Sequence, residues 1–149
     1  MLKIYTNNQQ HTTYTKLNDK ISQFDSAGIL YLNLPFKDGI IDKIKKDYDV
    51  PYNDIISINE HTEGYESLRD KFNREHIHKD FEMRYFINGT AVFSININNT
   101  VFELTVEPND LICIPANVKH WFDAGENPNF TAVRFFTEKD GWEAIYTEK

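Results

Sequence analysis

Apolar and polar residues alternate with a period of two through the second half of the sequence, and this pattern constrains the fold more than any other feature. Segments 92–97 and 101–106 each place an apolar residue at every second position. Turn-forming sequences separate such segments, among them Asn88-Gly89 and Asn98-Asn99. The pattern predicts strands over residues 85–87, 92–97, 101–106, 111–114, 120–122 and 131–136. Short strands at this spacing are typical of a mainly β protein that folds as a small sandwich or barrel.

Residues 1–73 follow a different rhythm, in which short apolar runs alternate with helical patterns. Strands are predicted over residues 1–5, 29–34 and 55–58, and helices over residues 18–27, 38–48 and 62–72. Asn18, Asp38 and Thr62 are the expected N-terminal caps of the three helices. Because no repeat, low-complexity stretch or long linker divides the chain, we expect a single domain over residues 1–149. In this domain a lead-in of residues 1–73 packs on a β-barrel of residues 74–149.

Composition and charge exclude several classes of protein. The chain has 149 residues, of which 14% are aromatic, and a formal net charge of −7. It lacks the cluster of Lys and Arg that is typical of nucleic-acid binding, and no segment approaches 18 consecutive apolar residues. The single cysteine, Cys113, excludes an intrachain disulfide and favours a reducing compartment. We therefore expect a soluble, cytoplasmic protein with neither a nucleic-acid nor a membrane partner.

A candidate metal site lies in the segment EHIHKDFEMR, residues 75–84. His76 and His78 are two positions apart, so on a strand their imidazoles point to the same face and can converge inside a barrel. Glu82 follows on the next predicted strand, and His120 begins a later one. Three imidazoles and one carboxylate suit Fe(II), Ni(II), Mn(II), Co(II) or Zn(II), whereas Ca(II) and Mg(II) prefer oxygen ligands. A histidine pair by itself is more often two polar surface residues than a metal site.

The spacing of these residues resembles the two sequence signatures of the cupin family. The first signature is matched by H-x-H, three residues, Glu82, six residues and Gly89. The second is matched by residues 109–120, with asparagine in place of glycine at positions 109 and 117. Asparagine tolerates the left-handed backbone conformation better than other non-glycine residues, so both exchanges are mild. The resemblance implies a cupin-type β-barrel, also described as a double-stranded β-helix or jelly roll.

Residues 67–142 are similar, more specifically, to the bacterial acireductone dioxygenases. The similarity lies in EHIHKDFEMRYFINGTAVFSI, in NDLICIPANVKHWFDAGENPNFTAVRFF and in the GW that follows. The resemblance implies that one Fe(II) or Ni(II) per chain is bound by His76, His78, Glu82 and His120. It also implies that substrate is contacted by Arg84, and that the substrate pocket is formed by Phe72, Phe122, Arg134 and Trp142.

The resemblance implies an activity as well. Enzymes of this family cleave the acireductone 1,2-dihydroxy-5-(methylthio)pent-1-en-3-one with O₂ in methionine salvage. With Fe(II) the implied products are formate and 4-methylthio-2-oxobutanoate, and with Ni(II) they are 3-methylthiopropanoate, formate and carbon monoxide. The fork-shaped, permanently charged guanidinium of Arg84 suits a developing oxyanion, although an internal ion pair with an acid such as Glu103 is the alternative. We expect the protein to act as a monomer.

One position departs from the pattern of this family. Relatives commonly carry an acidic residue directly before the ligand glutamate, where it has been considered as a proton acceptor, but here that residue is Phe81. Asp80 lies one position earlier, and a shift of one residue on a strand reverses the face to which a side chain points. Asp80 is therefore a candidate base only if the segment forms a turn. Solvent hydroxide is the other candidate.

The sequence is also compatible with two other functions. A metal-binding cupin can isomerise or epimerise its substrate without O₂, and a cupin can also be a non-catalytic binding module, because fold alone does not prove activity. Aromatic residues at this spacing, such as those assigned to the pocket, more often belong to an ordinary hydrophobic core.

Overall fold

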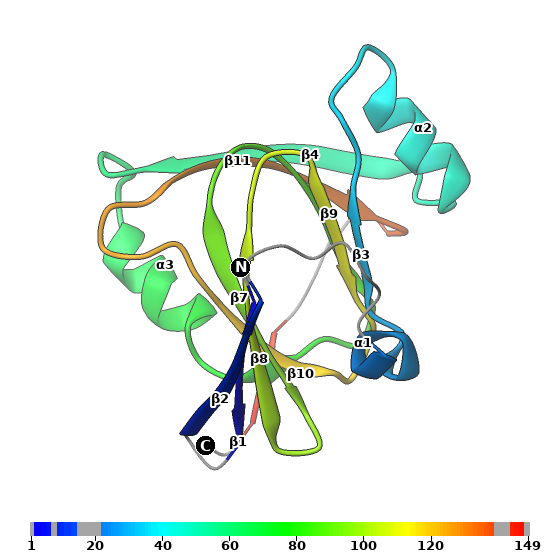
Figure 1. Cartoon of the computed structure of the whole chain (residues 1–149). Coiled ribbons are helices and arrows are strands. Elements are labelled where there is room, and N and C mark those ends of the chain that lie inside the picture. Colours follow the sequence, from blue (N-terminus) through cyan, green and yellow to red (C-terminus); the bar gives the residue numbers. More distant parts are fainter. Residues whose placement is uncertain (1, 7–8, 15–21, 139–143, 148–149) are drawn as a thin grey trace.

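The computed structural model of the chain describes residues 2–6, 9–14, 22–138 and 144–147, whose strands form two antiparallel sheets that face each other (Figure 1). The seven-stranded sheet has the order β12 (Ile145–Tyr146), β5 (His76–Ile77), β10 (Lys119–Asp123), β7 (Ala91–Ile97), β8 (Thr100–Val106), β1 (Leu2–Thr6) and β2 (Gln9–Tyr14). The five-stranded sheet has the order β3 (Leu30–Asn33), β9 (Asp110–Ile114), β6 (Glu82–Gly89), β11 (Asn129–Phe136) and β4 (Tyr52–Asn59). The mainly β architecture predicted from the sequence is confirmed.

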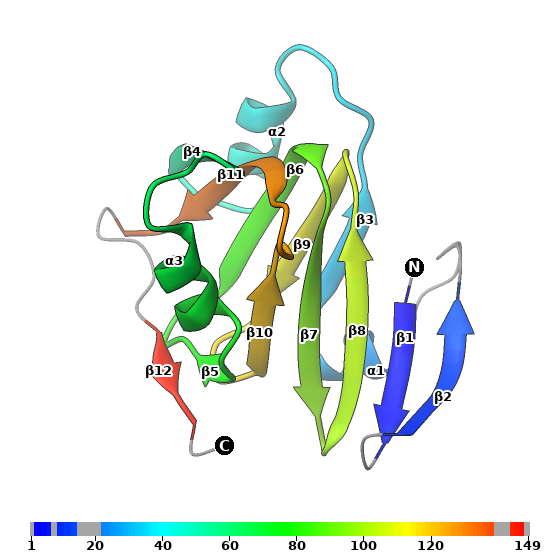
Figure 2. The ribbon, with the colours of Figure 1, turned by 90° about the vertical axis from the view of Figure 1, so that its left-hand side faces the viewer.

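Strands of the lead-in extend both sheets. In the seven-stranded sheet, β1 pairs with β8. In the five-stranded sheet, β3 pairs with β9 and β4 pairs with β11. Figure 2 shows the hairpin of β1 and β2 at one side of the seven-stranded sheet and β12 at the other. The described part of the lead-in therefore completes the two sheets and is not a separate layer.

Three helices lie against the sheets within the described residues: α1 (Ser22–Ala27), α2 (Ile40–Asp47) and α3 (Tyr65–Phe72). Figure 1 shows α2 outside the five-stranded sheet and α3 on the other side of the molecule, beside β10. Ile40 and Ile44, one helical turn apart, are the buried residues of α2. Within the described residues no helix is long and apolar enough to cross a bilayer.

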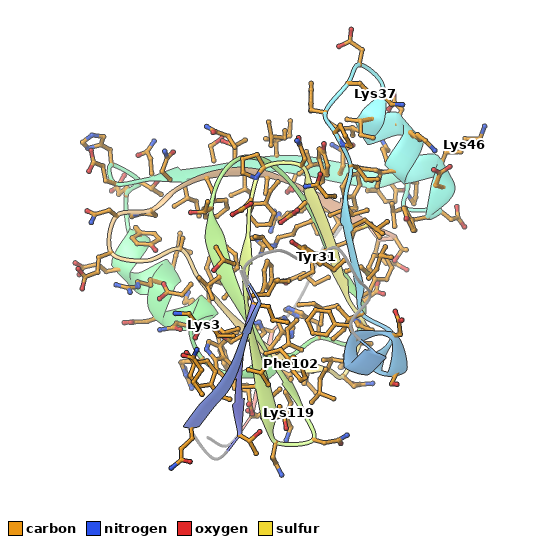
Figure 3. The ribbon with its side chains drawn as sticks, in the orientation of Figure 1. Lys3, Tyr31, Lys37, Lys46, Phe102 and Lys119 are labelled. Carbon is orange, nitrogen blue, oxygen red and sulfur yellow. The ribbon has the colours of Figure 1, made fainter. Side chains whose placement is uncertain are left out.

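The main core fills the space between the sheets. Phe86 of β6, Phe93 of β7 and Phe102 of β8 are at most 1% exposed, and Phe24 of α1 packs edge-on against Phe102 with ring centroids 5.5 Å apart. Phe102 lies in the interior in Figure 3, whereas Lys46 of α2 points outward. Each large apolar side chain buried in this way contributes about 1.5–3 kcal/mol to the free energy of unfolding.

A second hydrophobic cluster lies under α2, on the outer face of the five-stranded sheet. It includes Met83 and Tyr85 of β6 together with Ile40 and Ile44 of α2. Because side chains alternate along a strand, Met83 and Tyr85 point to this outer face, whereas Glu82, Arg84 and Phe86 point between the sheets. The alternation of β6 thus places one carboxylate and one guanidinium on the inner face.

Two turns show why particular residues are required. Asn98 and Asn99 have positive φ angles of +52° and +66° and form the two-residue turn between β7 and β8 that the sequence predicted. Gly89 has φ +75°, and a Cβ at this position would lie 1.8 Å from the backbone oxygen of Asn129.

Asn109 and Asn117, which replace signature glycines, have φ angles of +78° and +67°. The expectation that asparagine supports a left-handed backbone at these two positions is therefore confirmed.

Several details differ from the sequence-based predictions. The two sheets are not joined by strand pairing into a closed barrel among the described residues. Helix α2 begins after Gly39, not Asp38, and α3 begins after Gly64, because each glycine adopts the left-handed conformation at the N-cap. The Thr62 hydroxyl instead accepts a hydrogen bond from the Asn59 N–H. The predicted cap Asn18 lies outside the described residues.

Candidate metal centre

The three histidines singled out by the sequence converge between the sheets. His76 lies on β5 and His120 on β10, and the two are direct partners in the antiparallel register. His78 follows β5. One ring nitrogen from each of the three residues lies within 4.8 Å of the others, and each residue is at most 6% exposed. The expected convergence of the H-x-H pair with His120 is thus present in the structure.

Backbone carbonyls fix the orientation of two of these rings. His76 Nδ1 lies 2.6 Å from the Arg74 carbonyl oxygen, and His120 Nδ1 lies 2.9 Å from the Val118 carbonyl oxygen. Since a carbonyl oxygen can only accept, Nδ1 carries the proton in both rings. The Nε2 lone pair of each neutral imidazole is therefore available for a metal ion, the arrangement typical of histidine ligands.

Glu82 brings a carboxylate to the same point from the other sheet. Its Oε1 lies 3.4 Å from His78 Nε2, and its Oε2 lies 3.6 Å from His120 Nε2. His120 Nε2 and Glu82 Oε2 are buried and have no hydrogen-bond partner. Two ligand atoms about 2.0–2.2 Å from one ion and at right angles are roughly 3 Å apart, close to the spacing found here. A divalent cation would therefore give a partner to these buried polar atoms, whose burial without one destabilises the folded state.

The electrostatics of the cluster favour the protonation states that a metal requires. Burial lowers the pKa of His76 to about 4 and also lowers the pKa of His120. Burial alone raises the pKa of Glu82, but the Arg84 guanidinium and the neighbouring histidines outweigh it and hold that pKa below its ordinary range. Neutral imidazoles and an ionised carboxylate are therefore present at neutral pH, as metal coordination needs.

Arg84 places a buried cation beside this cluster. Its side chain is 6% exposed, and its Nη2 lies 3.6 Å from Glu82 Oε1. The guanidinium carbon lies 4.9 Å from the ring centroid of Phe122 and 6.0 Å from that of Phe93. Burial lowers the pKa of Arg84, with Glu82 acting against it, but a guanidinium stays protonated in proteins. The ion pair is formed with Glu82, while Glu103, the acid considered from the sequence, lies on β8.

Arg134 is the cross-strand neighbour of Arg84 on β11, so the two guanidinium groups share the inner face of the five-stranded sheet. Arg134 forms a two-pronged ion pair with Asp54 on the adjacent strand β4. Asp54 was not singled out by the sequence, although Asp54, Ile56 and Ile58 alternate on one face of their strand. That alternation is the signal by which Asp54 could have been found.

Only part of the aromatic wall predicted for the substrate pocket lies within the described residues. Phe72, at the end of α3, packs edge-on against Phe122 of β10 with ring centroids 6.2 Å apart. Phe122 is 4% exposed and also contacts Phe93 and Phe130, so it belongs to the main core as well as to the surroundings of Arg84. Trp142 lies outside the described residues.

Asp80 and Phe81 lie just before β6, and the contacts of each are to residues other than the histidines. One oxygen of Asp80 accepts a hydrogen bond from the Phe81 N–H, 2.8 Å away, and the other accepts one from the Thr137 hydroxyl, also 2.8 Å away. Phe81 packs against the cluster under α2, on the side opposite Glu82. An acidic side chain at position 81 would therefore not point toward the histidines.

Comparisons with known proteins show the family to which the chain is similar. Residues 4–144 match the model of the ARD/ARD′ family. The acireductone dioxygenase of Aquifex aeolicus (strain VF5) is 45% identical over 107 residues, which are 72% of this chain and 58% of that protein. The acireductone dioxygenase of Klebsiella oxytoca is 42% identical over 107 residues, which are 72% of this chain and 59% of that protein. The chain thus matches less than two thirds of the length of these relatives.

A solved structure extends the comparison to nearly the whole chain. The acireductone dioxygenase from Bacillus anthracis, which has a cadmium ion in its active centre, superposes with a TM-score of 0.78. The match has 25% sequence identity and covers 97% of this chain and 96% of that chain. The predicted cupin-type fold is thereby confirmed. With a family model that spans residues 4–144 and relatives above 40% identity, the chain belongs to the ARD/ARD′ family, that of the acireductone dioxygenases.

Proposed function

We propose that this chain is a metal-dependent dioxygenase that cleaves 1,2-dihydroxy-5-(methylthio)pent-1-en-3-one with O₂ in methionine salvage. The observation that carries the proposal is the convergence of buried imidazole and carboxylate groups on one point between the sheets. The names of the relatives and the cadmium ion of the Bacillus anthracis enzyme support it. The proposed ligands of a single Fe(II) or Ni(II) are His76, His78, Glu82 and His120.

The donor set fits such an ion. Three imidazole nitrogens and one carboxylate oxygen suit Fe(II) and Ni(II), and all four groups come from one chain, so the site needs no second subunit. When bound, the ion would act as a Lewis acid that orients the two enediol oxygens and stabilises their negative charge. The carbonyl acceptors on the Nδ1 side of His76 and His120 hold both rings in the ligating tautomer.

Arg84 is the group that we assign to the developing negative charge of the substrate. It lies on the same face as Glu82 and is buried, so its charge is poorly screened by water. The Phe122 ring packs against the guanidinium, with its centroid 4.9 Å from the guanidinium carbon. Phe72 and Phe122 would form part of the apolar wall for the methylthio group, because contacts between sulfur and aromatic rings are favourable. Trp142 stays a prediction for the same wall.

Proton removal from the enediol has two candidate acceptors, Asp80 and solvent hydroxide. The hydrogen bonds that occupy both oxygens of Asp80 favour hydroxide. A catalytic role for Asp80 stays a prediction.

Identification of the products tests the proposal. The purified chain is reconstituted without oxygen with Fe(II) or with Ni(II), then supplied with the acireductone and O₂. We expect formate and 4-methylthio-2-oxobutanoate with Fe(II), and 3-methylthiopropanoate, formate and carbon monoxide with Ni(II). An isomer or epimer of the substrate as the product in either case would replace this proposal with a non-oxidative cupin.

A further inference from the structure

The strand that carries His76 has few ladder pairs, although just after it the Asn117 N–H donates to the His78 carbonyl oxygen over 3.0 Å. Among the described residues, β5 pairs with β10 through one residue pair, His76 with His120. On its other side, β5 pairs with β12 through two residue pairs, one of which joins His76 to Tyr146. By contrast, β6 pairs with β9 over four residue pairs. A strand with so few ladder bonds opens easily unless other contacts hold it.

Side-chain contacts from Glu75 supply that hold. Glu75 Oε2 accepts a hydrogen bond of 3.0 Å from Asn96 Nδ2, and Glu75 Oε1 accepts one of 2.6 Å from the Thr147 hydroxyl. The Thr147 N–H donates to the Glu75 carbonyl oxygen over 3.1 Å. Asn96 lies on β7 and is 9% exposed, whereas Thr147 follows β12. One carboxylate therefore joins the interior of the sheet to the C-terminal segment, and we call Glu75, Asn96 and Thr147 the C-terminal latch.

The latch lies on the opposite face of the sheet from the histidines. Glu75 precedes His76 directly, and neighbouring residues of a strand point to opposite faces. On the histidine face, the ring of Tyr146 lies edge-on to the ring of His76, with centroids 5.9 Å apart. The Tyr146 hydroxyl donates to the Lys71 carbonyl oxygen at 3.1 Å, which ties β12 to the end of α3. The C-terminal segment thus contacts the residues 75–76 from both faces.

We infer that the C-terminal latch is a positioning device for the metal ligands, in which Glu75 and Thr147 keep β5 closed against β10. This inference rests on the proposed function, because it takes His76 and His78 as ligands. The latch side chains lie on the face of the sheet opposite the histidines, so their effect acts through the placement of the two imidazoles. When β5 is closed against β10, His76 and His78 stay in the position that binds the ion, and the ion is therefore lost more slowly.

Thr147→Val tests the latch, because valine keeps the shape of the side chain and the backbone N–H but removes the hydroxyl donor. Thr147→Ser retains the donor and is the rescue variant. Thr131→Val is the matched control, since it removes a hydroxyl that hydrogen-bonds to Ser57 on the other sheet, at 2.9 Å. The first readout is the rate at which a chelator removes Ni(II) from the loaded protein. The second is amide hydrogen exchange of residues 75–78 in the metal-free protein.

Thr147→Val should lose Ni(II) about fivefold faster than wild type, the effect of one typical net hydrogen bond on an equilibrium. Its amides at 75–78 should exchange faster by a similar factor, while Thr147→Ser and Thr131→Val behave as wild type. Wild-type rates of Ni(II) loss and exchange in Thr147→Val would overturn the latch and leave the proposed ligands intact. A wild-type protein that binds no Ni(II) would overturn both the ligand assignment and the latch.

Discussion

His76 and His120 are direct cross-strand partners whose ring centroids lie 4.5 Å apart, although they are 44 positions apart in the sequence. The pairing of β5 with β10 is what converts two distant sequence motifs into one site. Glu82 reaches the same point from the opposite sheet. The proposed metal would therefore link the two sheets, which are not joined there by strand pairing in the described residues.

Removal of a proposed ligand should remove the metal. Replacement of His78 or Glu82 by alanine takes one donor from a buried set of four, so we expect most of the bound metal to be lost. His61→Ala is the control, because the His61 side chain is 85% exposed and lies beside Glu60, not in the histidine cluster. Metal content of the three purified proteins, measured by elemental analysis, checks this. Equal metal in all three would contradict the ligand assignment.

Metal should also stabilise the fold. An ion that binds the folded chain alone raises the apparent stability by mass action. We therefore expect the thermal midpoint of wild-type protein to fall after treatment with a chelator, and the midpoint of Glu82→Ala to be insensitive to added metal. Identical midpoints for loaded and metal-free wild type would show that the site is not organised as described.

Arg84→Lys should separate metal binding from turnover. Lysine keeps the positive charge but loses the planar fork and the stacking on Phe122. We expect metal content to stay near wild type and kcat to fall by about 10²–10³, the range for loss of one donor to a developing oxyanion. If metal and turnover are lost together, Arg84 is a structural partner of Glu82 and not the group that faces the substrate.

Phe81→Asp should not create a better enzyme. Position 81 faces the apolar cluster under α2, so the substitution buries a carboxylate among Met83, Tyr85 and their neighbours. We expect a loss of about 1–3 kcal/mol in the free energy of unfolding, measured with urea, and a turnover within roughly tenfold of wild type. Phe81→Leu, which keeps the apolar contact, is the control. A rise in turnover of more than tenfold would show that an acid at this position does reach the substrate.

The ion pair between Arg69 and Asp123 should give a pH-dependent contribution to stability. It joins α3 to β10, with Nε to Oδ1 at 2.9 Å. Burial alone raises the pKa of Asp123, but hydrogen bonds from Arg69 and the Gly125 N–H outweigh it and lower that pKa. A carboxyl whose pKa is lower in the folded state stabilises the fold above the unfolded pKa of about 3.9 and loses this effect as the pH falls through the folded pKa.

Arg69→Gln should therefore lower the thermal midpoint at pH 7, and its difference from wild type should shrink as acid protonates Asp123. Lys43→Gln, which breaks an exposed pair with Asp47 one turn along α2, is the control and should change little at either pH. Thermal midpoints between pH 7 and pH 3 make the comparison. A difference that stays constant over this range would assign the role of Arg69 to packing instead of charge.

The sequence predicted the inner face of the site because that face follows from the period of a strand. His76 with His78 and Glu82 with Arg84 are spaced by two, so each pair had to share a face, and all four lie between the sheets. The left-handed asparagines at 109 and 117 followed from residue type together with the signature glycines that they replace. Local rules were sufficient for these features.

Features that depend on distant pairing were not predictable in the same way. Glu75 bonds to Thr147, which is 72 positions away, and Asp80 bonds to Thr137, which is 57 positions away. Strand β12 has two residues and carries too little periodicity to be recognised. The start of α2 moved from Asp38 to Gly39 because a left-handed glycine at the N-cap replaced the side-chain cap. In each case the feature depends on tertiary contacts or on backbone conformation, which the local sequence pattern does not determine.

Oxygen consumption is the most direct test of whether this chain cleaves the acireductone with O₂. Fe(II)-loaded wild-type protein and His78→Ala are each mixed with the acireductone in an oxygen electrode. Atoms balance when one O₂ and one acireductone give one formate and one 4-methylthio-2-oxobutanoate. We expect uptake of one O₂ per acireductone by wild type and only the uncatalysed rate with His78→Ala. A wild-type protein that binds Fe(II) and acireductone yet takes up no O₂ above the uncatalysed rate would exclude the proposed dioxygenase activity.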